Sequence, residues 1–293
     1  MKSFWKKSWW LLSFVCLFLA SDLLLTWLAP VERSDYFPKN DYQKVILQKD
    51  GEKEFNKVFY GNSVVTCGYL EAESVSGYVN LGISYGKMQD IYLGLKHGDI
   101  VTRDLVVGMN YLTYLDTLDT DFSYPWYREW YQPYLYFQRD KLYAFFSTGA
   151  ENLLKGEPFA AKRYDNYNRS LASGHLSGKE IEEKVESHRE LYWGLGLENY
   201  QDNLAYAEKL VEYCREHDIR LRVLWMPWRN DVEMPDTVKA VMEQANSIFE
   251  RSGIEVHDMT DALTVECFND IGHLNQEYGM SVFTKEVDPW LIQ

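Results

Sequence analysis

The stretch KVFYGNS, residues 57–63, decides the fold. Its apolar part predicts a buried strand over Lys57–Tyr60, and a glycine and two polar residues follow at once. A small residue ahead of Ser63 lets the chain turn sharply and present a hydroxyl at the strand's carboxyl end. The same letters also fit an ordinary helix start, because serine is a favoured N-cap residue. The stretch therefore predicts a strand that ends at a serine, whose role depends on its surroundings.

Four more short apolar runs have the character of strands. Helical patterns separate the last three of the predicted strands. The five predicted strands are Lys57–Tyr60, Gly77–Leu81, Leu105–Val107, Leu221–Trp225 and Ile254–Asp258. Residues 199–217 and 236–252 repeat apolar side chains at helical spacing, and Gly253 is suited to end the second helix. Alternation of strands and helices predicts an α/β fold with a mostly parallel sheet covered on both faces.

The N-terminal part of the chain has the features of a membrane anchor. Residues 1–8 form a basic flank, and residues 9–29 form an apolar run with one charge, Asp22. About 20 residues of helix cross the hydrocarbon core of a bilayer, so this run is long enough for a transmembrane helix. The basic flank predicts a cytoplasmic N-terminus with the rest of the chain extracellular. A cleaved signal peptide is the alternative, because residues 19–21 offer a small-residue site, although the apolar run continues past it.

The acidic residue inside this run needs an explanation. Asp22 would cost about 2.5–3.5 kcal/mol at the centre of a membrane-spanning helix. Its apolar neighbours can outweigh that cost, or a tilt of the helix can bring the carboxylate close to the headgroups. The alternative hypothesis is that Asp22 contacts a polytopic membrane partner.

The remaining chain divides into a linker and one extracytoplasmic domain. Residues 30–54 are polar and predict a juxtamembrane linker, and residues 55–293 predict the domain. Within it, residues 111–198 interrupt the strand–helix alternation, are rich in aromatics and predict a helical insertion beside the sheet. Its side chains Trp126, Trp130 and Tyr131 are candidates for a substrate groove that stacks on sugar faces. Alternatively, they fill a core or rest on a membrane interface.

Composition narrows the classes of function. The chain has 293 residues, of which 46% are hydrophobic, and a formal net charge of −14. This is enough apolar material for a folded core, while the acidic balance argues against an electrostatic nucleic-acid binder. The four cysteines form no CxxC pair and the histidines lack ligand spacing, so no metal site is predicted. The chain also lacks a glycine-rich nucleotide loop, and no cofactor is predicted.

Three further loops carry groups suited to acyl-transfer chemistry. Asp270 and His273 are three residues apart, a spacing that puts both on one face of a helical turn. There the carboxylate can fix the imidazole tautomer, although a surface Asp–His contact is the alternative. Gly82 and Asn110 follow the second and third strands and can supply donors to a developing oxyanion. Because ligands of doubly wound sheets bind at the strands' carboxyl ends, Ser63, Gly82 and Asn110 are expected to lie together.

In this order the loops resemble the four sequence blocks of the SGNH/GDSL hydrolase superfamily. The blocks here are Gly61-Asn62-Ser63, Asn80-Leu81-Gly82, Gly108-Met109-Asn110 and Asp270-Ile271-Gly272-His273. The resemblance covers about residues 55–290 and implies a flavodoxin-like three-layer α/β/α SGNH fold. Its five-stranded parallel sheet would have the order 2-1-3-4-5.

The resemblance also implies roles for individual residues. Ser63 would be the nucleophile, His273 the base and Asp270 the carboxylate that orients it. The oxyanion hole would consist of the Ser63 N–H, the Gly82 N–H and the Asn110 amide. Two positions depart from the family pattern: Asn62 stands where an acidic residue is usual, and Tyr111 stands where an aspartate often follows the asparagine.

A single anchor ahead of such a domain is similar to the DltD-like and alginate-O-acetylation-like proteins. That similarity implies a polytopic membrane-bound O-acyltransferase as partner and an envelope polysaccharide or teichoic-acid-like polymer as acceptor. The predicted function is acyl transfer, in which Ser63 takes the acyl group as an ester and a polymer hydroxyl then attacks it. One alternative is a membrane-anchored esterase or deacetylase with water as acceptor. The other is a non-catalytic partner protein that keeps the fold.

Overall fold

The computed structural model describes residues 2–31, 49, 52–118, 130–156, 158–159 and 172–293. It consists of two compact units. The first contains residues 1–43 and 124–164, and the second contains residues 44–123 and 165–293. The predicted insertion, residues 111–198, is thus divided between the two units, and each unit is described by itself below.

The second unit is built on a five-stranded parallel sheet. Its strands are β1 (Lys57–Gly61), β2 (Val79–Gly82), β3 (Asp104–Met109), β4 (Arg220–Trp225) and β5 (Val256–Asp258). They lie in the order β2-β1-β3-β4-β5, and every neighbouring pair is parallel. The predicted doubly wound sheet and its strand order are therefore confirmed. The order places β1 and β3 side by side, so the loops after them meet at one edge.

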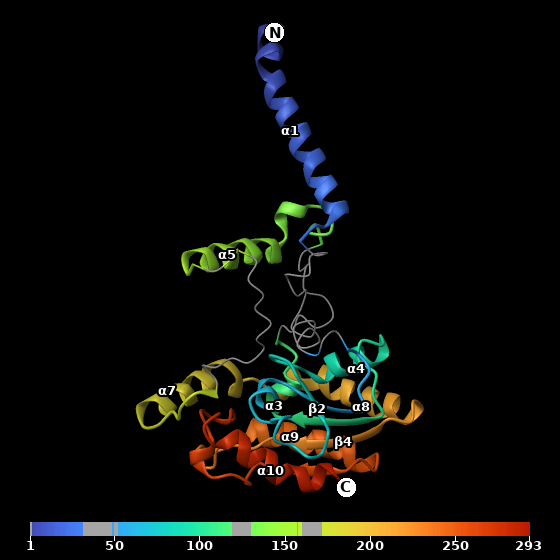
Figure 1. The fold of residues 1–293 in the computed structure, drawn as a ribbon, viewed down its shortest axis with the longest axis vertical. Helices are drawn as coiled ribbons and strands as arrows, with labels where there is room; N and C mark the ends of the chain where they lie inside the picture. Colours follow the sequence, from blue (N-terminus) through green and yellow to red (C-terminus); the bar gives the residue numbers. More distant parts are fainter. Residues whose placement is uncertain (1, 32–48, 50–51, 119–129, 157, 160–171) are drawn as a thin grey trace. The chain divides into compact units, whose positions relative to one another are not determined.

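Helices cover both faces of this sheet (Figure 1). The helices of this unit are α3 (Ser63–Thr66), α4 (Met88–Lys96), α7 (Lys179–His188), α8 (Gln201–Glu216), α9 (Asp236–Arg251) and α10 (Gly279–Leu291). Short helical turns add η1 (Tyr111–Tyr114), η3 (Arg189–Trp193), η4 (Leu197–Tyr200) and η5 (Val265–Cys267). Phe59 of β1 and Leu224 of β4 share a buried cluster with Phe283 of α10. The next residue of β4, Trp225, points to the opposite face and donates to Asn246 of α9.

The sequence periodicity of the two long helices corresponds to their buried faces. In α9 the side chains of Val238, Val241, Ala245 and Phe249 are buried, as predicted. Gly253 follows this helix with a φ of +71°, a left-handed conformation that favours glycine at a helix C-terminus. The spacing of apolar residues was therefore enough to place these helices against the sheet.

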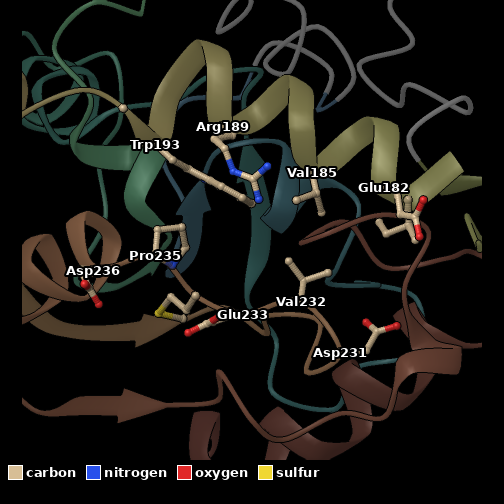
Figure 2. A pocket seen from close by; sticks show the side chains of 12 residues that line it. Glu182, Val185, Arg189, Trp193, Asp231, Val232, Glu233, Pro235 and Asp236 are labelled. Atoms are coloured by element: carbon tan, nitrogen blue, oxygen red, sulfur yellow. The ribbon is translucent and has the colours of Figure 1, made fainter. Parts of the chain in front are cut away.

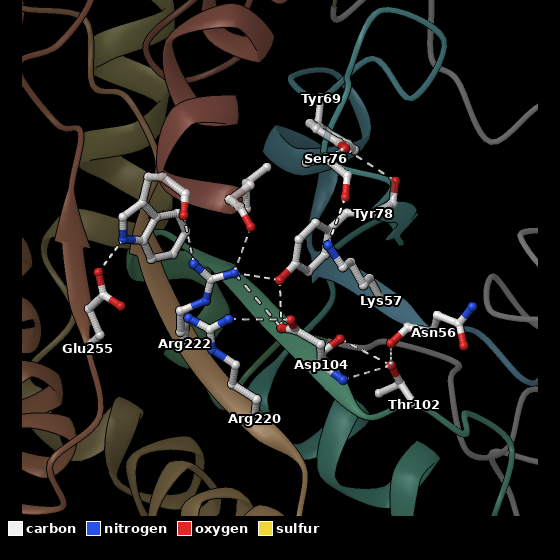
Figure 3. Close-up of polar contacts among 12 residues, drawn as sticks. Asn56, Lys57, Tyr69, Ser76, Tyr78, Thr102, Asp104, Arg220, Arg222 and Glu255 are labelled. Atoms are coloured by element: carbon white, nitrogen blue, oxygen red, sulfur yellow. Dashed lines mark hydrogen bonds and ion pairs between the residues drawn. The ribbon is translucent and has the colours of Figure 1, made fainter. Parts of the chain in front are cut away.

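A buried charged network holds the amino ends of the strands (Figure 3). The Arg222 guanidinium donates to the carbonyls of Trp290 and Leu291 at 2.8 and 3.1 Å, at the C-terminal end of α10. It also donates to the Tyr78 hydroxyl, which in turn donates to Asp104 at 2.6 Å. The guanidinium therefore caps carbonyls at the C-terminal end of α10 and fixes this helix to the sheet.

The first unit contains α1 (Lys2–Leu28), η2 (Tyr136–Gln138) and α5 (Asp140–Leu154). Within the described part of the chain, one helical segment is long and apolar enough to cross a membrane, Trp9–Leu28 of α1. The rings of Phe18 and Phe137 stack at 5.4 Å, so η2 packs against α1.

Candidate active site

Three side chains from distant parts of the second unit form a hydrogen-bonded relay. Ser63 is the first residue of α3, directly after β1, and its Oγ lies 2.9 Å from His273 Nε2. His273 Nδ1 lies 2.9 and 3.0 Å from the two carboxylate oxygens of Asp270. Asp270 is buried and His273 is nearly so, with side-chain exposures of 4% and 15%. The sequence spacing of Ser63 and His273 is 210 residues, and folding reduces it to one hydrogen bond.

The backbone around Asp270 differs from the predicted helical turn. Residues 269–272 form a bend, and Phe268 pairs with Leu274 in an isolated antiparallel bridge. Asp270 Oδ1 accepts hydrogen bonds from the backbone N–H groups of Gly272 at 3.1 Å and His273 at 2.9 Å. Aspartate side chains that bond their own backbone two and three residues on favour turns over helix. The carboxylate and the imidazole therefore meet through a side-chain-capped bend.

Electrostatics keep Asp270 ionised. Burial opposes its charge, but the His273 imidazole and the two backbone N–H groups outweigh burial and hold the pKa of this carboxyl well below its ordinary value. Lys184 Nζ of α7 adds a cation 3.6 Å from Asp270 Oδ2. An ionised Asp270 accepts from His273 Nδ1–H, which leaves Nε2 as an acceptor for the Ser63 hydroxyl. The tautomer required of a general base is thus set by the neighbouring groups.

Asn110 is oriented by a chain of amide hydrogen bonds that begins beside Ser63. The Val64 N–H donates to Asn62 Oδ1 at 3.1 Å, so the Asn62 amide nitrogen faces the other way and donates to Asn110 Oδ1 at 2.7 Å. The Thr113 N–H also donates to Asn110 Oδ1, at 3.2 Å. The backbone N–H groups of Val64 and Thr113 can act only as donors, so each must face an amide oxygen. These two contacts therefore fix the orientations of the Asn62 and Asn110 side-chain amides. Among the described residues none accepts from Asn110 Nδ2, so this nitrogen is free to donate to a ligand.

Gly82 has a partner inside its own loop. The Gly82 N–H donates to Asn80 Oδ1 at 2.9 Å, and Asn80 Nδ2 donates to the carbonyls of Val65 and Tyr69 at 3.0 and 2.8 Å. Asn80 thereby ties the end of β2 to the segment that follows Ser63. A role for the Gly82 N–H as an oxyanion donor stays a prediction.

A small cavity of about 40 Å³ lies beside the relay. Its polar lining residues include Ser63, Asn110 and His273, and most of its surface is apolar. The apolar lining consists largely of Trp225, Met226, Pro227, Trp228, Met234, Val238, Met242 and Ile271. These side chains come from the end of β4, the following loop, α9 and the loop before His273, so the cavity lies at the carboxyl edge of the sheet.

A larger cavity of about 540 Å³ lies between α7 with η3 and the segment that joins β4 to α9 (Figure 2). Arg189 and Trp193 border it on one side, and Asp231 and Glu233 on the other. Met234 lines both cavities. The rings of Trp193 and Trp228 pack together with their centroids 6.0 Å apart, and Trp228 lines the small cavity. The two cavities therefore share a wall of side chains.

Sequence reasoning missed two residues of α7 that lie near the relay. Lys184 approaches Asp270, and His188 lines the small cavity, where its Nδ1 lies 2.9 Å from the Tyr111 hydroxyl. Burial lowers the pKa of His188 to about 4, so its ring is neutral at pH 7 beside the Tyr111 hydroxyl. Both residues lie more than 120 positions after Ser63 and more than 80 positions before Asp270, and no motif marks them. Tyr111, which stands where the resembled family often has an aspartate, thus contacts α7.

Three of the predicted binding residues belong to the first unit or fall outside the description. Trp126 lies outside the described residues. Trp130 and Tyr131 belong to the unit that contains α1, where their rings contact each other at 5.9 Å. Their role as a substrate groove stays a prediction. Within the described residues no group of His, Cys, Asp and Glu is arranged to hold a metal ion.

Asp22 has partners within its own unit. It is 3% exposed, although most side chains of its helix are exposed. Its carboxylate accepts from the backbone N–H groups of Tyr136 at 3.2 Å and Phe137 at 3.0 Å. These bonds satisfy N–H groups at the start of η2 and give the acidic residue a reason to occupy an apolar helix.

Comparison with known proteins gives only distant likenesses. No protein-family profile matches the chain, and no curated protein matches it. A Streptococcus pneumonia structure, described provisionally as a platelet activating factor, is 11% identical, with 93% of this chain and 98% of that chain covered and a TM-score of 0.47. An acetyl xylan esterase is 10% identical (80% and 98% covered, TM-score 0.40), and a GDSL-like lipase from Bacteroides thetaiotaomicron is 11% identical (85% and 98%, TM-score 0.41). At these values the likenesses assign no function to this chain.

Proposed function

We propose that this chain is a serine-dependent acyl-transfer enzyme of the SGNH/GDSL type. The observation that carries the proposal is the Ser63–His273–Asp270 relay, with hydrogen bonds of 2.9 Å or slightly more between consecutive groups. Such a relay turns a weakly nucleophilic hydroxyl into an attacking group because the imidazole takes its proton as the new bond forms. The oriented amide of Asn110 at the same cavity adds a donor for the oxyanion.

The reaction would proceed in two balanced halves. Ser63 Oγ attacks the acyl carbonyl of an ester donor while His273 Nε2 accepts the hydroxyl proton. The carbonyl oxygen becomes an oxyanion, which Asn110 Nδ2–H stabilises together with the predicted backbone donor of Ser63. The predicted Gly82 N–H would join them only by releasing Asn80 Oδ1. Collapse breaks the bond to the donor's alkoxy group, which leaves as an alcohol with the proton from His273. An acceptor hydroxyl then attacks the acyl-serine, and His273 again carries the proton.

We further propose that the acceptor is a glycopolymer of the cell envelope and that the chain works beside a membrane-bound O-acyltransferase. Support comes from the apolar helix α1, which suits an anchor that keeps the second unit at the extracellular surface of the cell membrane. The partner proposal does not rely on Asp22, because that carboxylate already accepts two N–H groups of η2. A membrane-anchored esterase or deacetylase is the second candidate, since the same relay serves water as the acceptor.

The first experiment tests whether Ser63 is a reactive nucleophile. The full chain, purified in detergent, is treated with a fluorescent serine-directed phosphonate. We expect one labelled site at Ser63, with labelling abolished in Ser63→Ala and strongly reduced in His273→Ala. Ser84→Ala is the matched control, because Ser84 lies outside the relay and the variant should label like the wild type. Labelling of a folded Ser63→Ala chain at the wild-type rate would exclude Ser63 as the nucleophile.

A second experiment separates transfer from hydrolysis. The same preparation receives an acyl ester with and without candidate envelope glycans, and acylated glycan is measured against free acid by mass spectrometry. Acyl transfer predicts a glycan-dependent product at the expense of free acid. Release of free acid alone, even with the anchor in a bilayer and the membrane partner restored, would favour the esterase.

A further inference from the structure

In the first unit, the segment of residues 130–139 has polar side chains inside and large apolar side chains outside. Gln132 is 1% exposed and Arg139 is 2% exposed, whereas Trp130 is 81% exposed and Tyr134 is 65% exposed. A segment that folds in water shows the opposite distribution, because charged side chains are almost never fully buried there. The distribution therefore indicates that the outer surface of this segment faces an apolar medium.

The buried polar side chains serve backbone groups of the same segment. Arg139 Nε donates to the Gln132 carbonyl at 3.1 Å, and the Asp22 carboxylate of α1 accepts the N–H groups of Tyr136 and Phe137. In the core of a bilayer, irregular backbone is tolerated only where protein groups replace water as its partners. These contacts therefore suit the segment to hydrocarbon.

The two buried charges of this region have opposite signs. The Arg139 guanidinium lies 4.8 Å from the centre of the Tyr136 ring, and Asp22 accepts the N–H group of the same residue. One cation and one anion thus lie on either part of Tyr136, and their formal charges cancel. Such pairing reduces the cost of holding charged groups in a medium of low dielectric constant.

The contacts with α1 give the segment a depth. A helix rises about 1.5 Å per residue, so Asp22 lies about 9 Å and Phe18 about 15 Å before Leu28, where the apolar span ends. The ring of Phe137 stacks on that of Phe18, with the centroids 5.4 Å apart. When Trp9–Leu28 fills a hydrocarbon core of about 30 Å, Phe137 reaches close to its middle.

α5 follows this segment directly and has an exposed apolar stripe. At about 100° per residue, five exposed side chains fall within about 100° of its circumference. They are Tyr143, Phe146, Ala150, Leu153 and Leu154. Ser147 and Glu151 form an exposed polar edge beside the stripe, and Leu142 and Asn152 are buried on the other side. A helix with this pattern is suited to lie in the plane of a bilayer interface, with the apolar stripe against the acyl chains.

We propose that residues 130–154 form a second membrane-embedded element. Residues 130–139 enter the half of the bilayer that surrounds the C-terminal end of α1, and α5 lies in its interface. The partner of this surface is lipid, because the Phe18–Phe137 stack makes it continuous with the exposed apolar side chains of α1. The inference rests on α1 crossing the bilayer and is independent of the chemistry at Ser63.

The test measures the depth of single probes in the full chain, reconstituted in phosphatidylcholine vesicles. Cys16 is exposed and the other three cysteines are buried, so Cys16→Ala provides the background. A bimane probe is attached to Phe137→Cys, Leu154→Cys or the matched control Glu151→Cys, on the polar edge of α5. We expect a lipid with a doxyl group deep in its acyl chain to quench the Phe137 probe most, and one with a shallow doxyl group the Leu154 probe. Iodide in water should quench the Glu151 probe at least about fivefold more than the other two.

A second experiment needs no substitution. The wild-type chain in the same vesicles is photolysed with an apolar diazirine dissolved in the bilayer, and mass spectrometry locates the modified residues. Insertion at Phe137, Phe146 and Leu154 in addition to α1 would support the embedded element. Insertion confined to α1, or absent from the chain, would overturn it, as would a Leu154 probe that iodide quenches like the Glu151 probe. Shielding of the Leu154 probe from both iodide and the doxyl lipids would overturn it too, because a protein surface then covers the stripe.

Discussion

Asn62 holds a position where the resembled family usually has an acidic residue. Both the oxygen and the nitrogen of its side-chain amide form hydrogen bonds. Its oxygen accepts the Val64 N–H at the start of α3, and its nitrogen donates to Asn110 Oδ1. An aspartate can make the first contact but not the second, because an ionised carboxylate has no proton to donate. Asn62 thus acts as a positioning residue: it turns the Asn110 nitrogen toward the cavity.

The substitution Asn62→Asp isolates this positioning role. Aspartate is as good an N-cap as asparagine, so α3 and the thermal midpoint should change little. Asn110 Oδ1 would lose the Asn62 donor, keep the Thr113 N–H and face a carboxylate. That repulsion favours an amide turned with its oxygen toward the site, and we expect kcat to fall about 10- to 100-fold with a small change in KM. Steady-state ester hydrolysis and a thermal melt measure the two quantities. A variant that melts normally and turns over at the wild-type rate would remove Asn62 from the mechanism.

At the scale of elements, α7 and η1 meet at a part-buried contact, in which the Tyr111 hydroxyl lies 2.9 Å from His188 Nδ1. The imidazole is neutral at pH 7 because burial opposes a charge on the ring. Burial lowers the pKa of His188 to about 4, below the value of about 6.5 expected in the unfolded chain. Since the unfolded state then binds the proton more readily, the stabilisation is complete above about pH 6.5 and is lost as the pH falls toward 4.

This linkage predicts a pH dependence that belongs to His188. Between pH 7 and pH 5 the wild-type unfolding free energy should fall by on the order of 1–2 kcal/mol more than that of His188→Asn. Asparagine can accept the Tyr111 proton and does not titrate, so it is the matched variant. Urea unfolding followed by tryptophan fluorescence measures the difference at each pH. Identical losses in the two proteins would show that His188 does not couple proton binding to folding.

At the scale of the whole molecule, the chain separates into a unit that contains the apolar helix and a unit that contains the relay. In the first unit, Asp22 bonds two N–H groups of η2, and several apolar side chains of α5 are exposed, among them Tyr143, Phe146 and Leu154. An acidic residue thereby fixes a second segment of chain to the apolar helix. Such a unit would be suited to the interface of a bilayer.

Substituting Asp22 distinguishes an internal role from a partner contact. Asp22→Leu makes the span more apolar, so the chain should stay in the membrane pellet after an alkaline wash. The N–H groups of Tyr136 and Phe137 would lose their acceptors, and we expect residues 130–156 to become more sensitive to protease. Asp22→Asn keeps an acceptor and should remain protected. Unchanged protection in Asp22→Leu, with loss of a co-purifying membrane protein, would favour the partner contact instead.

Some features of this molecule followed from short-range pattern. The apolar strands, the buried faces of α8 and α9, and the glycine after α9 depend on residues a few positions apart, so periodicity and backbone preference were sufficient to predict them. The meeting of Ser63 with Asn110 also followed from the sequence, because parallel strands bring the loops at their carboxyl ends to one edge. The predicted helical turn at Asp270 was wrong, since the carboxylate bonds its own backbone and closes a bend.

By itself, then, the sequence determined the strands and the buried helix faces, and the resemblance of its four motifs implied the strand order and the groups of the relay. Only the tertiary structure decided how α7 brings Lys184 and His188 to that relay, which way the Asn110 amide points, and that Asp22 accepts the N–H groups of η2. The physical reason is sequence separation. Periodicity and propensity act over neighbouring residues, whereas these contacts join side chains that lie tens of positions apart. Such side chains pair only in the folded chain, where buried polar groups must find partners.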